Sequence, residues 1–245
     1  MLSRLKEARK LLPSDLKCET ETLLLQIKKM GASIAGVGDV NIGLAPEFKH
    51  MPRAISIGIK HSISGKQVSD KPCHISNCFI IDRQLQIIQK ALVCQLRFQG
   101  WRALAIPPDS HRYDNSYISR LYPLFPHKTA ATCAGLGWVG KSGLLINDKF
   151  GPRLNWATVL SDAPLETSRN PILDSRCGDC RKCVDFCPAG AISNNHWKRG
   201  DTYQNMIDIN RCARHLKRNI KMYGNANCGL CIINCPRGKS IYAKT

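Results

Sequence analysis

Hydrophobic positions in the first 170 residues alternate between helical and strand spacing. Residues 20–30 and 84–98 carry apolar side chains three or four positions apart, and Gly31 and Gly100 follow them as helix terminators. Short apolar runs bounded by turn residues predict strands, which fall at 33–38, 54–59, 103–106, 142–147 and 156–160. Because helices and strands alternate along the chain, we expect an α+β or layered α/β domain.

The distribution of cysteines indicates where this domain ends. Five of the thirteen cysteines are scattered before residue 170, and these are Cys18, Cys73, Cys78, Cys94 and Cys133. The other eight lie after it, so we predict two domains, residues 1–170 and residues 171–245. Cys94 falls within the predicted helix 84–98, where we expect it to be a buried packing residue.

The first cysteine run has the spacing of a bacterial-type iron–sulfur domain. It follows the pattern C-x2-C-x2-C-x3-C-P, with ligand positions at Cys177, Cys180, Cys183 and Cys187. In this pattern three thiolates bind one [4Fe–4S] cluster and the fourth binds the other cluster. A structural zinc site needs only four ligands, usually as two separated C-x2-C pairs. The run therefore predicts two [4Fe–4S] clusters rather than zinc.

The second cysteine run lacks its first cysteine. Cys228, Cys231 and Cys235 are followed by Pro236, and Cys212 is the only cysteine between the two runs, so we assign it as the missing ligand. By the crossover rule, the first cluster takes Cys177, Cys180, Cys183 and Cys235, and the second takes Cys187, Cys212, Cys228 and Cys231. Two linked clusters beside a larger domain favour electron delivery over a purely structural role.

A glycine-rich stretch before the cysteine runs matches two nucleotide-binding patterns at once. Residues 135–142, GLGWVGKS, satisfy both G-x-G-x-x-G and G-x4-G-K-S. Both patterns require a strand before the glycines and a helix after them. The predicted order here is the reverse, with a helix at 126–134 and a strand at 142–147, so we reject nucleotide triphosphate binding. Gly135 is then expected as a helix C-cap, and the other glycines indicate close backbone approach to a bulky planar ligand.

The chain is strongly basic and has no apolar run long enough to cross a membrane. Its formal charge of +18 becomes about +14 once eight thiolates and two cluster cores are counted. Residues 171–245 hold thirteen Lys and Arg against five Asp, a local excess of +8. This excess either offsets the anionic clusters or attracts a polyanion such as tRNA. The charged N-terminus lacks the apolar segment of a signal peptide, so we expect a cytoplasmic protein.

Together, the glycine stretch and the cysteine runs resemble the epoxyqueuosine reductases. The resembling segments are AGLGWVGK at 134–141, the first cysteine run, Arg211-Cys212, and NCGLCIINCP at 227–236. Reductive dehalogenases share the general plan. The resemblance implies a nitroreductase-like domain that holds base-off cobalamin, with the corrinoid pocket lined by Gly135, Gly137, Gly140 and Lys141. It also implies a C-terminal ferredoxin-like module whose two [4Fe–4S] clusters supply the electrons.

The chain departs from the tRNA-modifying reductases at their proton donor. Those enzymes carry an acidic residue shortly before the Ala-Gly-Leu-Gly-Trp motif, whereas residues 121–127 here contain neither Asp nor Glu. Tyr122 and His127 are the weak candidates for a proton donor in this stretch. We therefore predict an iron–sulfur, corrinoid-dependent reductase acting on an unidentified substrate.

Two alternative functions remain open. One is a non-catalytic protein that transfers electrons or handles corrinoids, and the other is a tRNA epoxyqueuosine reductase. The expected partner is a low-potential electron donor such as ferredoxin or flavodoxin, with tRNA or a corrinoid protein as further candidates and no membrane partner.

Overall fold

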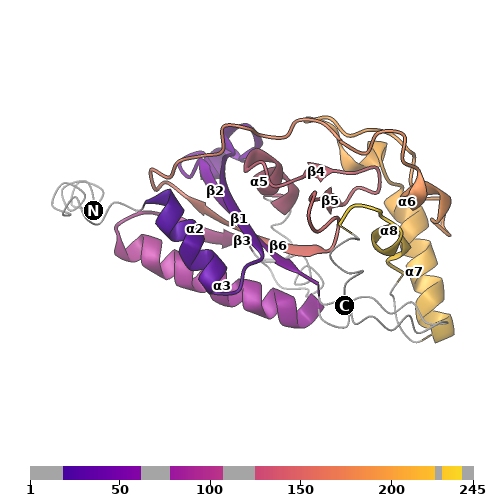
Figure 1. The fold of residues 1–245 in the computed structure, drawn as a ribbon, viewed down its shortest axis with the longest axis horizontal. Coiled ribbons are helices and arrows are strands. Elements are labelled where there is room, and N and C mark those ends of the chain that lie inside the picture. The colour runs from indigo at the N-terminus through magenta and orange to yellow at the C-terminus, as the bar shows by residue number, and fades with distance from the viewer. Residues whose placement is uncertain (1–18, 62–77, 107–124, 224–227, 239–245) are drawn as a thin grey trace. The chain divides into compact units, whose positions relative to one another are not determined.

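The computed structural model describes residues 19–61, 78–106, 125–223 and 228–238, and the chain divides into two compact units (Figure 1). The first unit holds the described residues of Met1–Ile59, Phe79–Leu136 and Asn155–Pro171. The second unit holds those of Lys60–Cys78, Gly137–Leu154 and Ile172–Thr245. The segment Gly137–Leu154 therefore packs with the cysteine runs, although Asn155–Pro171 follows it in the chain and belongs to the first unit. No helix within the described ranges combines the length and the apolar character that a membrane span requires.

The first unit is built on a four-stranded sheet with the order β1-β2-β6-β3. Its strands are β1 (Ile34–Asp39), β2 (Arg53–Lys60), β3 (Ala103–Ile106) and β6 (Leu154–Ser161). β1 pairs antiparallel with β2, with Ile34 opposite Gly58, and β3 pairs antiparallel with β6, with Ala103 opposite Ser161. Four of the strands predicted from short apolar runs are present, each within two residues of its predicted bounds.

Helices cover both faces of this sheet. Helices α2 (Thr20–Lys29) and α3 (Cys78–Phe98) share a core with Ile55 and Ile57 of β2, whereas α5 (His127–Cys133) shares a second core with Ala54. Because successive strand residues point to opposite faces, β2 is buried along almost its whole length. The predicted mixed helix and sheet fold is thus confirmed. Two 3-10 turns, Asn41–Gly43 and Pro46–Phe48, follow β1.

Glycines allow α5 to approach β1 closely. A Cβ atom at Gly38 would lie 2.6 Å from the Ala134 nitrogen, and one at Gly36 would lie 3.0 Å from a methyl carbon of Leu136. α5 ends as predicted, since Gly135 has a φ of +71°, a left-handed conformation that favours glycine. The chain therefore leaves the first unit directly after this C-cap.

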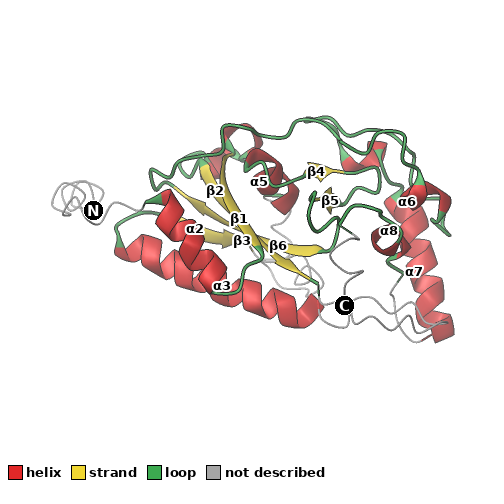
Figure 2. Cartoon of the chain, viewed as in Figure 1, coloured by secondary structure: helices red, strands yellow, loops and turns green. Residues whose placement is uncertain are grey.

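Apart from the fifteen-residue helix Ile209–Tyr223, the second unit contains short elements connected by loops (Figure 2). The strands β4 (Trp138–Val139) and β5 (Leu145–Ile146) form a hairpin. The helices are α6 (Lys182–Asp185), α7 (Ile209–Tyr223) and α8 (Leu230–Ile233), with a 3-10 turn at Tyr203–Asn205. The predicted strand 142–147 is shorter than expected because a turn occupies its first residues, where the Gly143 N–H bonds to the Gly140 carbonyl at 2.8 Å.

Candidate metal centre

Cysteines from both runs surround one cavity of about 400 Å³ in the second unit. Three of them, Cys177, Cys180 and Cys183, come from the first run, and Cys231 and Cys235 come from the second. The seven cysteines of the two runs and Cys212 are all half-buried. The fold therefore brings the first three thiols together with Cys235, which lies more than fifty residues later in the chain.

The remaining cysteines lie near one another as a second group. The pKa of the Cys212 thiol is raised by burial first, and then by the charges of Cys187 and Cys228. The pKa of Cys231 is raised to about 12 by burial, with Cys228 and Cys212 as its strongest charged neighbours. The structure thus brings together the same two sets of four cysteines that the crossover rule groups. Cys231 lies between the sets, since it also lines the cavity of the first.

These thiols bind a proton tightly when no metal is present. Burial raises the pKa of Cys183 to about 11, and the neighbouring Cys177 and Cys235 add to the increase. Burial also raises the pKa of Cys235, although Arg153 and a hydrogen bond from the Arg237 backbone act in the opposite direction. The raised pKa values of these two thiols disfavour their thiolate forms, and binding to a metal core offsets this cost.

The spacing of the donors suits a cluster better than a single ion. Among the described residues, no three His, Cys, Asp or Glu side chains lie close enough together to hold one metal ion. The first set of cysteines lines the wall of a cavity instead of converging on a point. A multi-iron cluster with sulfur bridges needs ligands spread around a cavity, whereas a tetrahedral zinc ion needs ligands that converge on one point.

Glycine makes the turn between the first two cysteines of each run. Gly178 has a φ of +52° and Gly229 a φ of +59°, so both have the left-handed conformation. A Cβ at Gly178 would meet no heavy atom within 4 Å, so backbone conformation, and not crowding, is the reason for glycine there. Gly229 also caps the N-terminus of α8, and its carbonyl accepts the N–H groups of Ile232 and Ile233.

The β4–β5 hairpin forms one side of the cysteine cavity. Gly140, Lys141 and Ile146 line it, and a Cβ at Gly140 would lie 3.3 Å from the Cys177 sulfur. The Lys141 side chain is 3% exposed, and its Nζ donates a hydrogen bond to the Cys180 carbonyl at 3.2 Å. A buried ammonium at this position lowers the electrostatic cost of an anionic cluster.

The other two glycines assigned to a corrinoid pocket pack closely against backbone atoms of this chain. A Cβ at Gly137 would collide with the Ile146 carbonyl, and one at Gly135 would lie 2.8 Å from the Asn170 carbonyl oxygen. The space that these glycines leave is therefore filled by protein backbone. Of the four residues assigned to the corrinoid pocket, Gly140 and Lys141 line the cavity of the cysteines.

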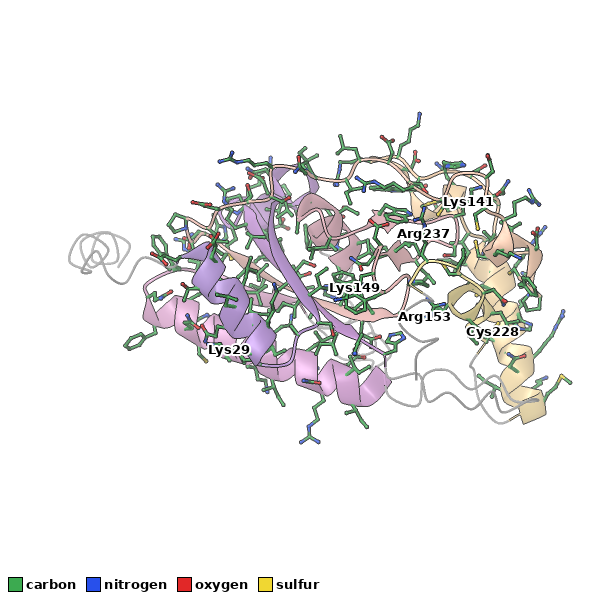
Figure 3. All side chains as sticks on the ribbon, viewed as in Figure 1. Lys29, Lys141, Lys149, Arg153, Cys228 and Arg237 are labelled. Atoms are coloured by element: carbon green, nitrogen blue, oxygen red, sulfur yellow. The ribbon has the colours of Figure 1, made fainter. Side chains whose placement is uncertain are left out.

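Arg153 holds the second cysteine run in place. It follows the hairpin, is 2% exposed, and donates hydrogen bonds to four backbone carbonyls. These are Arg237 at 2.7 Å, Cys235 at 2.8 Å, Ile232 at 3.1 Å and Ile233 at 3.4 Å. Figure 3 labels Arg153 and Arg237. Neither Arg153 nor this clamp was predicted, because an isolated arginine just before a strand carries no motif.

Trp138 connects the hairpin to the cysteines through packing. Its fully buried side chain shares a small apolar core with Ile146 and Ile172, against which Cys177 and Cys235 pack. Arg237 lies over the indole ring at 5.5 Å from its centroid. The aromatic residue of the glycine stretch thus has a structural role beside the first cysteine set.

The other residues singled out in the sequence lie elsewhere. His127 belongs to the first unit, is 4% exposed, and its Nδ1 lies 2.9 Å from the Thr158 hydroxyl. Cys94 is exposed on α3, so the prediction that it is buried was wrong: its position falls outside the apolar stripe of Leu85, Ile88 and Leu92. Cys133 is half-buried at the end of α5. Cys78 begins α3, whereas Tyr122, Cys18 and Cys73 lie outside the described residues.

Comparison with known families identifies the region that contains both cysteine groups. Residues 176–238 match the family described as the 4Fe-4S double cluster binding domain. The chain carries a double-cluster iron–sulfur domain. This domain covers all eight cysteines assigned as ligands, and it confirms the two [4Fe–4S] clusters expected from the spacing.

Sequence relatives of this iron–sulfur protein are reductases. An epoxyqueuosine reductase of Cyclobacterium marinum is 37% identical over 91 residues, which cover 37% of this chain and 26% of the relative. That of Leadbetterella byssophila is 47% identical over 94 residues, or 38% of this chain and 27% of the relative. A tetrachloroethene reductive dehalogenase of Dehalobacter restrictus is 33% identical over 123 residues, which cover 44% of this chain and 21% of the relative. The matched stretches thus span about a quarter of these relatives, and the resemblance to both groups is confirmed.

Solved structures share the fold over most of this chain. The epoxyqueuosine reductase of Streptococcus thermophilus matches 89% of the chain and 66% of its own length, with a TM-score of 0.59 and 14% identity. A catabolic reductive dehalogenase matches 86% of the chain and 31% of its own length, with a TM-score of 0.61 and 21% identity. A further epoxyqueuosine reductase with a TM-score of 0.60 was solved with a tRNA-Tyr stem loop.

Proposed function

We propose that this chain is a reductase that passes electrons through two [4Fe–4S] clusters to a corrinoid, which acts on an unidentified substrate. The observation that carries the proposal is the convergence of cysteines from both runs on one cavity. Crossed ligation of this kind holds two clusters close together, which suits stepwise electron transfer. In this proposal the first cluster is held by Cys177, Cys180, Cys183 and Cys235, and the second by Cys187, Cys212, Cys228 and Cys231.

The two buried cations give the electron path a direction. Lys141 donates to the Cys180 carbonyl and Arg153 to the Cys235 carbonyl, and both cysteines are ligands of the first cluster in this assignment. Positive charge and hydrogen bonds close to a cluster favour its reduced, more negative state. In this proposal the first cluster receives electrons from the second, and the two buried cations beside the first cluster stabilise its reduced state.

The corrinoid is supported by the relatives and not by a cradle within the described residues. One structural neighbour, a reductive dehalogenase with a TM-score of 0.60, was solved in a study of B12-dependent dehalogenation. We extend the cofactor from that protein to this chain, together with the nitroreductase-like assignment of the first unit. Gly140 and Lys141 line the cavity of the first cysteine set, so in this proposal they lie beside the first cluster, on the path of the electrons to the corrinoid.

An anaerobic titration tests this function. The protein is reconstituted with iron and sulfide, reduced with dithionite, and titrated with cob(II)alamin while optical and EPR spectra are recorded. Saturable binding, followed by electron transfer from the clusters, supports the proposal, and absence of binding overturns it. Cys94→Ser is a matched control, because it removes an exposed thiol of the first unit and should change neither signal. Binding without turnover of any organic substrate would favour a corrinoid-reducing protein.

A tRNA substrate is the second candidate. Two observations favour it: the net charge of +18, and the solved relative with a tRNA stem loop. Incubation of the loaded protein with epoxyqueuosine-containing tRNA, followed by nucleoside analysis, decides this point. Formation of queuosine would assign the substrate, and unchanged nucleoside would exclude it.

A further inference from the structure

α7 carries a dense row of exposed positive charge on the helix that contains Cys212. Its fifteen residues include five Lys or Arg and no Asp or Glu, and all five cations are exposed. They are Arg211, Arg214, Lys217, Arg218 and Lys221. At 1.5 Å per residue the row extends for about 15 Å along the helix.

The opposite face of α7 points into the unit. Cys212 and Leu216 are half-buried and Asn219 is 6% exposed, and these three lie on one side at helical spacing. The cations lie on the other side, so the helix separates a face that contributes a cluster ligand from a face that is free to meet a partner.

Most of these cations are not neutralised by the chain. Arg211 pairs with Asp208 at 3.3 Å. Within the ranges that the structure describes, Arg214, Lys217, Arg218 and Lys221 form no ion pair. A charged row of this kind attracts anionic surfaces and speeds their association.

Apolar side chains flank the charged row. Ile220 is 49% exposed and Met222 is 69% exposed, on either side of the cations. Methionine and arginine are enriched at protein interfaces, whereas single-stranded nucleic acid is usually bound by aromatic platforms. α7 has Tyr223 as its last residue, beyond the end of the charged row, and no Trp or Phe. These features favour an acidic protein over RNA.

We propose that the exposed basic face of α7 docks an acidic electron-donor protein of the ferredoxin or flavodoxin class. The inference deepens the proposed function by naming where electrons enter, and it rests on Cys212 as a ligand of the second cluster. A donor bound on α7 lies over the helix that holds this ligand, so the transfer distance is short. The donor loses one electron and the cluster gains one, and no bond or proton is exchanged.

The test compares charge reversal on α7 with the same change elsewhere. Arg214→Glu/Arg218→Glu reverses two free cations of the face, and Lys28→Glu/Lys29→Glu makes the same charge change on exposed residues of α2 (Figure 3 labels Lys29). Anaerobic stopped-flow absorbance measures cluster reduction by photoreduced flavodoxin and, separately, by dithionite. Iron content establishes that each variant retains both clusters.

We expect the α7 variant to react with flavodoxin at least about tenfold more slowly at low ionic strength. The difference should disappear in high salt, and dithionite should reduce all three proteins equally. Equal flavodoxin rates for the α7 variant and wild type, or an equal loss in the α2 variant, would overturn the proposal. Loss of tRNA stem-loop binding with an unchanged flavodoxin rate would assign the face to RNA instead. Because the assay contains no cobalamin, its outcome is independent of whether the corrinoid proposal holds.

Discussion

Removing the Arg153 guanidinium should release the second cysteine run and, with it, both clusters. The side chain is 2% exposed and bonds four carbonyls, three of them within 3.1 Å. Arg153→Met keeps much of the apolar stem but leaves these buried acceptors without their charged donor. A hydrogen bond to a charged group contributes about 1.5–3 kcal/mol, so the loss of at least two of these bonds costs about 3–5 kcal/mol.

This energy predicts a large effect on cluster retention. If iron loss requires the second run to open, about 3–5 kcal/mol corresponds to an acceleration of two to three and a half powers of ten. The assay is anaerobic challenge with an iron chelator, followed by bleaching of the cluster absorbance. Arg153→Lys retains the charge but not the planar fork, so we expect an intermediate rate.

A matched control is available on the same segment. Lys149 is exposed and lies four residues before Arg153 (Figure 3), so Lys149→Met should lose iron at the wild-type rate. If Arg153→Met also lost iron at that rate, the four hydrogen bonds would not be what holds the run, and the reasoning would be refuted.

Three other perturbations follow from the site. Gly137→Ala places a Cβ against the Ile146 carbonyl, so it should disrupt the β4–β5 hairpin and reduce bound iron, and full iron content would contradict this packing role. Cys212→Ala should lose about half of the iron, because one of two clusters loses a ligand; retention of close to eight irons would refute its assignment. Iron binding should weaken as pH falls, because the pKa values of Cys183 and Cys231, raised to about 11 and 12, mean that protons compete for these thiols. A flat profile of iron content between acidic and alkaline pH would count against this competition.

Local periodicity predicted the described strands and the helices α2, α3 and α5 of the first unit, although α3 begins at Cys78, six residues before its predicted start. β2 reads as a short apolar run because helices cover both faces of the sheet, and α2 ends at Gly31, whose φ is +103°. Cys94 shows the limit of this reasoning. Its position in a helix was correct, but the side of the helix on which it lies depends on which stripe faces the sheet.

The cysteine groups were predictable because their spacing reflects the geometry of a known inorganic core. The role of the β4–β5 hairpin could not be predicted, because it depends on contacts between residues that are far apart in the chain. Lys141 meets Cys180 and Arg153 meets Arg237, and neither pair has a sequence pattern. The glycine stretch was correctly separated from phosphate loops, yet the neighbours of Gly137 and Gly140 are a strand backbone and a cysteine sulfur, which only the fold places there.

The interleaving of the two units has a consequence for how the protein is made. The segment Gly137–Leu154 emerges from the ribosome well before the residues it supports. Arg153, for example, donates a hydrogen bond to the carbonyl of Arg237, which is synthesised 84 positions later. Crossed ligation adds a second delay, because the first iron cubane has no fourth thiol until Cys235 is synthesised. A nascent chain that stops short of this residue should therefore lack a stable first cubane, and one that stops short of Cys231 should hold neither. We therefore expect both clusters to be bound only after the second cysteine run has been synthesised.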